Sequence, residues 1–171
     1  MKISRIHKIV YAVILATLAL GAVLPAFAQS SRKQNIVEIA IANPDFSTLV
    51  MAVQKASLVD ALDGPKRLTV FAPTNAAFDD LAAQLGYADG VALVNALPAE
   101  QLTPILLYHV TNGNRPANSL FPPKNVRMLS GELAATLWGG GVRTIDGQPI
   151  LATNIRASNG VIHVIGGVMM P

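Results

Sequence analysis

The chain of 171 residues contains no cysteine and only one tryptophan. Without cysteine it can form no disulfide, it offers no thiolate to a zinc ion, and it has no lipidated cysteine with which to anchor itself after export. It also lacks any Asn-x-Ser/Thr sequon for glycosylation. A domain of this composition must therefore be held together by its hydrophobic core.

Long apolar runs are also missing, except at the N-terminus. There a basic start is followed by an uncharged apolar run over residues 9–24 and by the small residues of Ala26-Phe27-Ala28. This order is typical of a secretory signal peptide, so we expect residues 1–28 to be cleaved and the mature chain to begin at Gln29. A retained membrane anchor is the alternative, although the run is near the short end for a spanning helix.

The excess of basic residues belongs to this N-terminal segment. It carries three of the 13 Lys and Arg residues and none of the 10 Asp and Glu, so residues 29–171 carry ten of each. The net charge of the neutral mature chain gives no reason to expect binding to nucleic acid or to an anionic membrane. We expect residues 29–34 to be disordered and residues 35–171 to form a single domain. The product should be secreted, extracellular or periplasmic, with no membrane span after cleavage.

A strand that turns directly into a helix is predicted at residues 68–85. The residues from Leu68 to Phe71 are apolar or β-branched and favour a buried strand, which Pro73 ends. Thr74 or Asn75 then supplies a side-chain oxygen to cap the helix. The helix has one apolar stripe, formed by Phe78, Leu81, Ala82 and Leu85. We therefore expect Phe71 and Phe78 to be buried and to hold this corner together.

Other helices are predicted on both sides of this corner. Asn35 and Glu38 form a capping-box pattern that opens a helix through residue 42. Apolar spacing then predicts helices over residues 46–57, 58–62 and 89–97, and Gly86 is expected to end the central helix. Leu102, Ile105 and Leu106 mark a further helical stripe. This helix either begins with Thr103 as its cap and Pro104 at its first position or is kinked at Pro104, because proline lacks the N–H of a helix interior.

Strands and tight turns dominate from residue 125 onward. Two-residue hairpin turns are predicted at Gly131-Glu132, Asp146-Gly147 and Asn159-Gly160, and a glycine turn or bulge at 139–141. The helices precede the hairpins along the chain, and this order favours an α+β fold.

Three segments, taken together and in this order, resemble the fasciclin domain family. They are TVFAPTNAAF at residues 69–78, ILLYHVTNG at 105–113 and ASNGVIHVIGGVMMP at 157–171. The resemblance covers about residues 35–171 and implies a β-rich wedge or sandwich with several short helices packed on one side. The residues that carry the structural motifs are Phe71, Pro73, Thr74, Asn75, Phe78, Asn159, Gly160 and His163.

The chain departs from the family pattern at two places. Ala76 stands where family members often have an acidic residue, and Gly166-Gly167 stands where an aspartate often precedes the last apolar segment. Both departures remove negative charge near the central motifs and leave the apolar framework undisturbed.

No catalytic or metal-binding pattern is visible. His109 and His163 lie in apolar surroundings without an H-x-x-H-type partner, so we interpret both as core histidines bonded to the backbone. Ser158 lacks the first glycine of a nucleophile elbow and precedes a strand, and 139–141 is not a phosphate-binding loop. We expect no catalytic residue, no metal, no cofactor and no enzymatic activity.

The family resemblance implies an exported binding module that takes part in cell adhesion or in contact with extracellular matrix or a cell surface. Its partner would be an extracellular or cell-surface protein or polysaccharide. In fasciclin adhesion domains the Tyr-His pair, here Tyr108 and His109, is linked to integrin binding. We expect Tyr108 to be partly exposed, and His109 to be buried and bonded to backbone near the Thr74-Asn75 corner. The alternative function is a carrier of a small apolar ligand, either carotenoid-like or a lipid.

Overall fold

The computed structural model describes residues 33–120 and 123–171, and residues 33–171 cluster as one compact unit. The expected signal peptide and its cleavage point lie outside the described residues. Most of the segment expected to be disordered, residues 29–34, lies outside them too. Gln34 is described, and its carbonyl oxygen accepts a hydrogen bond of 2.8 Å from the backbone N–H of Ser158. The predicted disorder is therefore wrong at Gln34.

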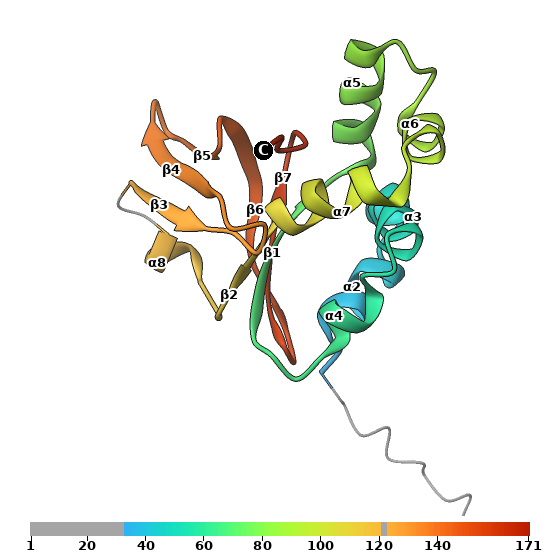
Figure 1. The fold of residues 1–171 in the computed structure, drawn as a ribbon. Helices are drawn as coiled ribbons and strands as arrows, with labels where there is room; N and C mark the ends of the chain where they lie inside the picture. The colour runs from blue at the N-terminus through green and yellow to red at the C-terminus, as the bar shows by residue number, and fades with distance from the viewer. Residues whose placement is uncertain (1–32, 121–122) are drawn as a thin grey trace, which may run out of the picture. The chain divides into compact units, whose positions relative to one another are not determined.

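A seven-stranded sheet in the order β2-β1-β7-β6-β5-β4-β3 forms the frame of this unit (Figure 1). Strands β1 and β7 are parallel, and the other pairs are antiparallel. The strands are β1 (Leu68–Pro73), β2 (Val110–Asn112), β3 (Lys124–Arg127), β4 (Leu133–Gly139), β5 (Val142–Ile145), β6 (Gln148–Ala157) and β7 (Gly160–Ile165).

The sheet curls until its two edges meet. The N–H of Leu129, just beyond β3, donates to the carbonyl of Val110 in β2 at 2.7 Å. Beside it, the hydroxyl of Thr111 donates to the carbonyl of Arg127 at 2.7 Å. These bonds occupy polar groups that would otherwise be left open at the edge strands, and they close the sheet into a near-barrel.

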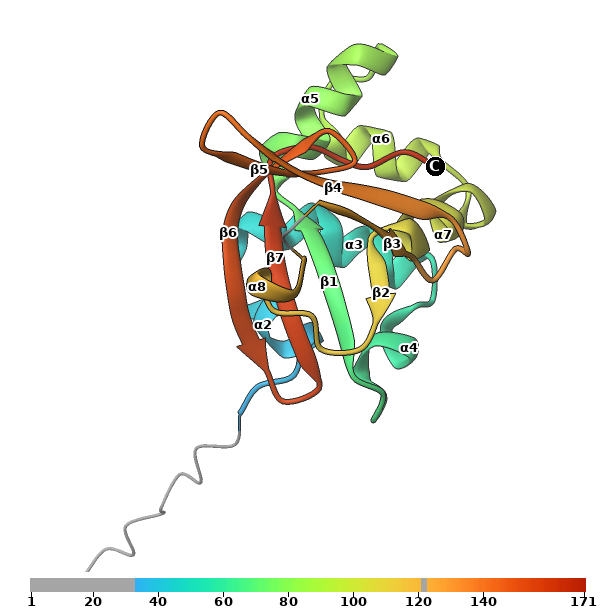
Figure 2. The same cartoon turned by 90° about the vertical axis from the view of Figure 1, so that its left-hand side faces the viewer.

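Helices α2 to α7 gather on one side of the sheet, whereas α8 lies on the other side, in front of β7 and β1 (Figure 2). This confirms the α+β prediction with helices mainly on one side. The helices are α2 (Ile36–Ala42), the 3-10 helix η1 (Pro44–Phe46), α3 (Ser47–Lys55), α4 (Val59–Asp63), α5 (Asn75–Leu85), α6 (Gly90–Ala96), α7 (Ala99–Tyr108) and α8 (Ala117–Leu120).

Local capping signals place several of these helix ends. Asn35 and Glu38 form the predicted capping box at α2. The Thr74 hydroxyl accepts from the N–H of Ala77 and caps α5, which ends at Gly86 with φ of 81°. The apolar stripe predicted for α5 is wrong at its last position, because Leu85 is 53% exposed. The helix has left the core one turn earlier.

Helix α7 begins at Ala99, five residues before Pro104, where one of the two predictions placed its start. Pro98 is the N-cap, so Pro104 lies inside the helix rather than at its first position. The Thr103 hydroxyl donates to the carbonyl of Ala99 at 2.8 Å and occupies one backbone acceptor of the first turn. The apolar packing of Leu102, which is buried, fixes this turn despite the proline.

Two of the predicted turns are confirmed and two are displaced. Asp146-Gly147 and Gly140-Gly141 join their strands, each with two positive φ angles, as a type I′ hairpin turn requires. The turn predicted at Gly131-Glu132 instead spans residues 129–131, because the N–H of Met128 pairs with the carbonyl of Glu132.

The turn between β6 and β7 is Ser158-Asn159, and Gly160 is already the first residue of β7. Residue 160 must be glycine because its backbone lies close to the backbone of Leu68 in β1, and not because of the turn. A Cβ on Gly160 would overlap the carbonyl oxygen of Leu68. The Asn-Gly pattern therefore predicted a turn between these two strands correctly, but the turn lies one residue earlier than predicted.

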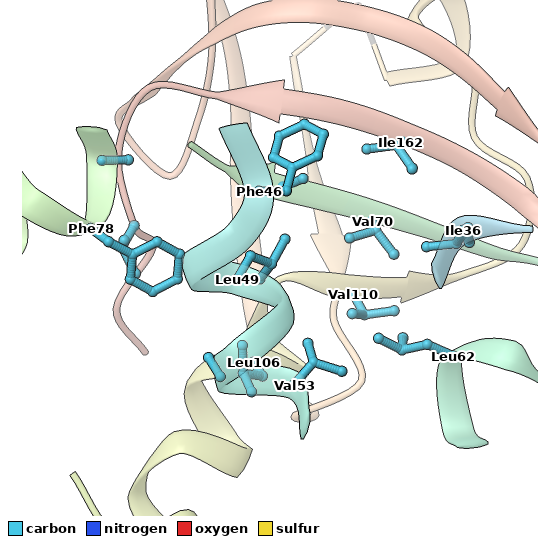
Figure 3. Close-up of a cluster of buried hydrophobic side chains, with 14 of the residues drawn as sticks. Ile36, Phe46, Leu49, Val53, Leu62, Val70, Phe78, Leu106, Val110 and Ile162 are labelled. Atoms are coloured by element: carbon cyan, nitrogen blue, oxygen red, sulfur yellow. The ribbon is translucent and has the colours of Figure 1, made fainter. Parts of the chain in front are cut away.

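Two hydrophobic cores lie on opposite faces of β1, because successive residues of a strand point to opposite sides. Val70 and Ala72 face the helices and share the first core with Phe78. In Figure 3, Leu49 and Val53 of α3 point toward this face. Phe71 belongs to the second core, inside the curled sheet. Phe71 and Phe78 are buried, as predicted, but they fill different cores.

Candidate functional site

The three motif segments lie side by side in the sheet. Strand β1 pairs in parallel with β7, where Phe71 is opposite His163, and pairs antiparallel with β2. The N–H of Phe71 donates to the carbonyl of His109 at 2.8 Å. The rings of Phe71 and His163 stack with centroids 5.5 Å apart. The segments that suggested a family are therefore one contiguous part of the scaffold.

His109 is buried, as predicted, and both of its ring nitrogens are engaged. Nε2 accepts from the N–H of Met169 at 2.9 Å, so Nδ1 carries the proton and donates to the carbonyl of Ile105 at 2.8 Å. Burial lowers the pKa of His109 to about 4, and the bond to Ile105 opposes that shift only in part. The predicted bond near the Thr74-Asn75 corner is wrong, because the chain's last residues pass over this ring instead.

Tyr108 is also buried, with only 4% of its surface exposed, so the prediction of partial exposure is wrong. Its ring packs in the second core, and its hydroxyl donates to the carbonyl of Leu133 at 3.4 Å. Burial raises the pKa of Tyr108 to about 12, and the nearby carboxylates of Asp146 and Glu132 contribute in the same direction. The end of α7 thus faces the base of β4, which the local sequence does not reveal.

His163 is fully buried and is a core histidine, as predicted. Its Nε2 lies 2.9 Å from the carbonyl of Arg115, to which it donates, and Nδ1 accepts from the N–H of Asn154 at 3.4 Å. Burial lowers the pKa of His163, so the ring is neutral. It therefore joins the loop before α8 to the sheet.

The two motif asparagines hold helices in place. Asn159 accepts from the N–H of Ile36 at 3.0 Å and donates to the carbonyl of Leu62 at 2.7 Å, which connects α2 and α4 with the turn before β7. Asn75 accepts from the N–H of Thr48 at 3.0 Å and so links the starts of α5 and α3. Both side chains act as structural clamps.

A small apolar cavity of about 80 Å³ lies between helices α2, α3 and α4 and the strands β1 and β2. Its lining includes Ile36, Leu49 and Val70, which Figure 3 shows turned toward one another, and also His109. Pockets that hold drug-sized ligands have volumes of about 300–1,000 Å³. The cavity as it stands is too small for a carotenoid or a lipid.

No cluster of three or more His, Asp or Glu residues suited to a metal ion is found within residues 33–120 and 123–171. In the same ranges no single helix is both long and apolar enough to cross a membrane. The segments Ile36–Ala42 and Pro44–Lys55 reach that length and composition only as a pair, and they are bent by 106°.

The comparisons with known proteins agree with this scaffold. The model of the fasciclin domain family matches residues 44–171, and the chain belongs to that family. It is 38% identical over 144 residues to protein sll1483 of Synechocystis sp., which covers 84% of this chain and 77% of that protein. It is 32% identical over 136 residues to transforming growth factor-beta-induced protein ig-h3 of Sus scrofa, which covers 80% of this chain and 19% of that protein.

The fold also matches a solved structure. This is a FAS1 domain pair from the insect cell adhesion molecule Fasciclin I, with a TM-score of 0.68 and 13% identity. The match covers 82% of this chain and 52% of the two-domain chain. At this level of identity the likeness shows the fold alone.

Proposed function

We propose that this protein is an exported, non-enzymatic binding module that serves in cell adhesion or surface interaction. Its partner is an extracellular or cell-surface protein or polysaccharide. One observation supports a surface rather than a catalytic cleft: the polar motif side chains Asn75, His109, Asn159 and His163 all make hydrogen bonds within the fold, mostly to the backbone. The export pattern and the membership of the fasciclin domain family favour the same function.

In this proposal Tyr108 and His109 hold the binding surface in shape and do not touch the partner. Both are almost fully buried, and His109 connects the end of α7 to the last residues of the chain. A side chain whose atoms are all packed or bonded internally has little surface left to offer a partner. The contacts are then made by exposed residues around them.

Binding of the labelled, purified protein to cells of the producing organism and to their isolated extracellular polysaccharide tests this function. We expect saturable binding that unlabelled protein displaces and that protease or glycosidase treatment of the cells removes. The same protein, heat-unfolded and labelled in the same way, is the control for non-specific adhesion of an unfolded polypeptide to the cells. If neither cells nor polysaccharide bind the folded protein saturably, the proposal is wrong.

The second candidate function is transport of a small apolar ligand, and the apolar cavity beside α3 is what favours it. At about 80 Å³ the cavity would have to widen several-fold to reach the usual size of a ligand pocket. Native mass spectrometry and an absorption spectrum of protein purified from its own host distinguish the two functions. If the protein is a binding module, it should be colourless and have the mass calculated for residues 29–171. If it is a carrier, its mass should be higher by the mass of a bound ligand.

A further inference from the structure

Exposed apolar side chains are concentrated on three neighbouring strands. Of the ten large hydrophobic residues that are exposed in the described ranges, five lie on β4, β5 and β6. They are Leu133, Leu137, Trp138, Val142 and Leu151. These strands stand on the side of the molecule away from α5 and α6 (Figure 1). Exposed apolar groups gathered in this way mark a surface that contacts a protein or a membrane.

The tip of the β4–β5 hairpin is apolar on both of its faces. Leu137 and Trp138 follow each other on β4 and therefore point to opposite sides, and each is more than half exposed. Val142 pairs with Gly139 at the start of β5 and is half exposed as well. The turn itself, Gly140-Gly141, has no side chains. Apart from Arg143, the side chains next to the turn are therefore apolar.

Beside the turn, the described residues of β4 and β5 include one charged side chain, Arg143. Arg143 pairs across the strands with Trp138, and its guanidinium carbon lies 5.4 Å from the centroid of the indole ring. The nearest acidic residues in sequence, Glu132 and Asp146, stand at the opposite end of the hairpin, where β4 begins and β5 ends. The tip is thus a combination of an aromatic ring, aliphatic groups and one cation.

An open groove of about 410 Å³ continues this surface toward β6. It lies beside Trp138 and Val142 and is lined on the far side by Ile150 and Leu151. Arg143 and Thr153 line it as well, so the groove is partly polar, and through it Leu151 lies next to the tip although it comes from another strand.

We propose that the β4–β5 hairpin tip inserts into the interface of a phospholipid bilayer, with Trp138, Leu137 and Val142 among the upper acyl chains and Arg143 at the lipid phosphates. A flat protein partner would cover one face of the hairpin and leave the other exposed, whereas an interface surrounds the tip on both sides. Tryptophan and arginine are both suited to this depth, since each has an apolar body and a polar end. This contact with lipid goes beyond the binding of a protein or polysaccharide proposed above.

Trp138 is the only tryptophan in the chain, so its fluorescence reports on the tip directly. The test mixes the purified exported protein with vesicles of equal parts phosphatidylcholine and phosphatidylglycerol. We expect the emission to shift to shorter wavelength as vesicles are added. The double variant Leu137→Ser/Val142→Ser should bind at least about tenfold more weakly, because two aliphatic side chains no longer leave water. Arg143→Gln should weaken binding by about fivefold, the effect of one basic residue at a lipid surface.

Val91→Ser is the matched control, since Val91 is 44% exposed on α6, away from the tip. It should bind vesicles like the parent, and all of these exposed-site variants should keep the parent's circular dichroism and melting curve. The proposal is overturned if vesicles leave the emission unchanged, or if the double variant binds them as tightly as the parent. It is also overturned if the tip variants lose binding to cells while the parent binds no vesicles, since the tip then contacts a protein or polysaccharide.

Discussion

Acid should destabilise this protein through His109 before it reaches the usual pKa range of carboxylic acids. In the folded state burial lowers the pKa of His109 from 6.5 to about 4, so the unfolded chain binds the proton more readily between these values. The stabilisation is fully present above pH 6.5 and is lost as the pH falls toward 4. Lowering the pH from 7 to 4.5 should cost about 2–3 kcal/mol of unfolding free energy from this residue.

Protonation also breaks a specific bond, because a protonated Nε2 can no longer accept from the N–H of Met169. Urea unfolding curves at a series of pH values measure the loss, and the variant His109→Gln is the control. That variant should be less stable at pH 7 but should have a flatter dependence on pH. His163, whose pKa is also lowered by burial, leaves a residual slope of the same sign. Equal slopes for parent and variant would refute the reasoning.

Three further outcomes are expected. Phe78→Ala should lower the unfolding free energy by about 3–5 kcal/mol in denaturant melts, since it empties part of the first core, and a loss below about 1 kcal/mol would contradict the packing. Asn159→Ala should lower the unfolding free energy by about 2–4 kcal/mol in the same assay, because the N–H of Ile36 and the carbonyl of Leu62 lose their hydrogen-bond partner. The variant Asn118→Ala, at an exposed site, is the control and should melt like the parent. N-terminal sequencing of the exported protein should begin at Gln29, and a protein that keeps Met1 would show that the signal is retained.

Features that depend on a few neighbouring residues could be predicted from the sequence. The capping box at Asn35, the cap at Thr74 and the glycine stop at Gly86 each need only side chains within one helical turn. The buried strand before Thr74 follows from its continuous apolar character. The α+β class likewise follows from the order of helices and hairpins along the chain.

Features that depend on distant residues could not be predicted. Tyr108 is buried by a hairpin that begins 25 residues later, and His109 is bonded to an N–H that lies 60 residues further along the chain. The turn before β7 is shifted by one residue because Gly160 must pass close to Leu68 in a neighbouring strand. No local pattern contains these contacts, so Tyr108 is buried where partial exposure was expected, and the buried His109 has other hydrogen-bond partners than predicted.

The central claim is that Tyr108 and His109 maintain the fold while other residues contact the partner. Its most direct test is the saturable cell-binding titration of His109→Ala beside the parent, at a temperature at which circular dichroism shows both to be folded. We expect the variant to be less stable by about 1–3 kcal/mol, the usual cost of leaving a buried polar partner unpaired, and to bind with the parent's affinity per folded molecule. A variant that melts like the parent but no longer binds would contradict the account.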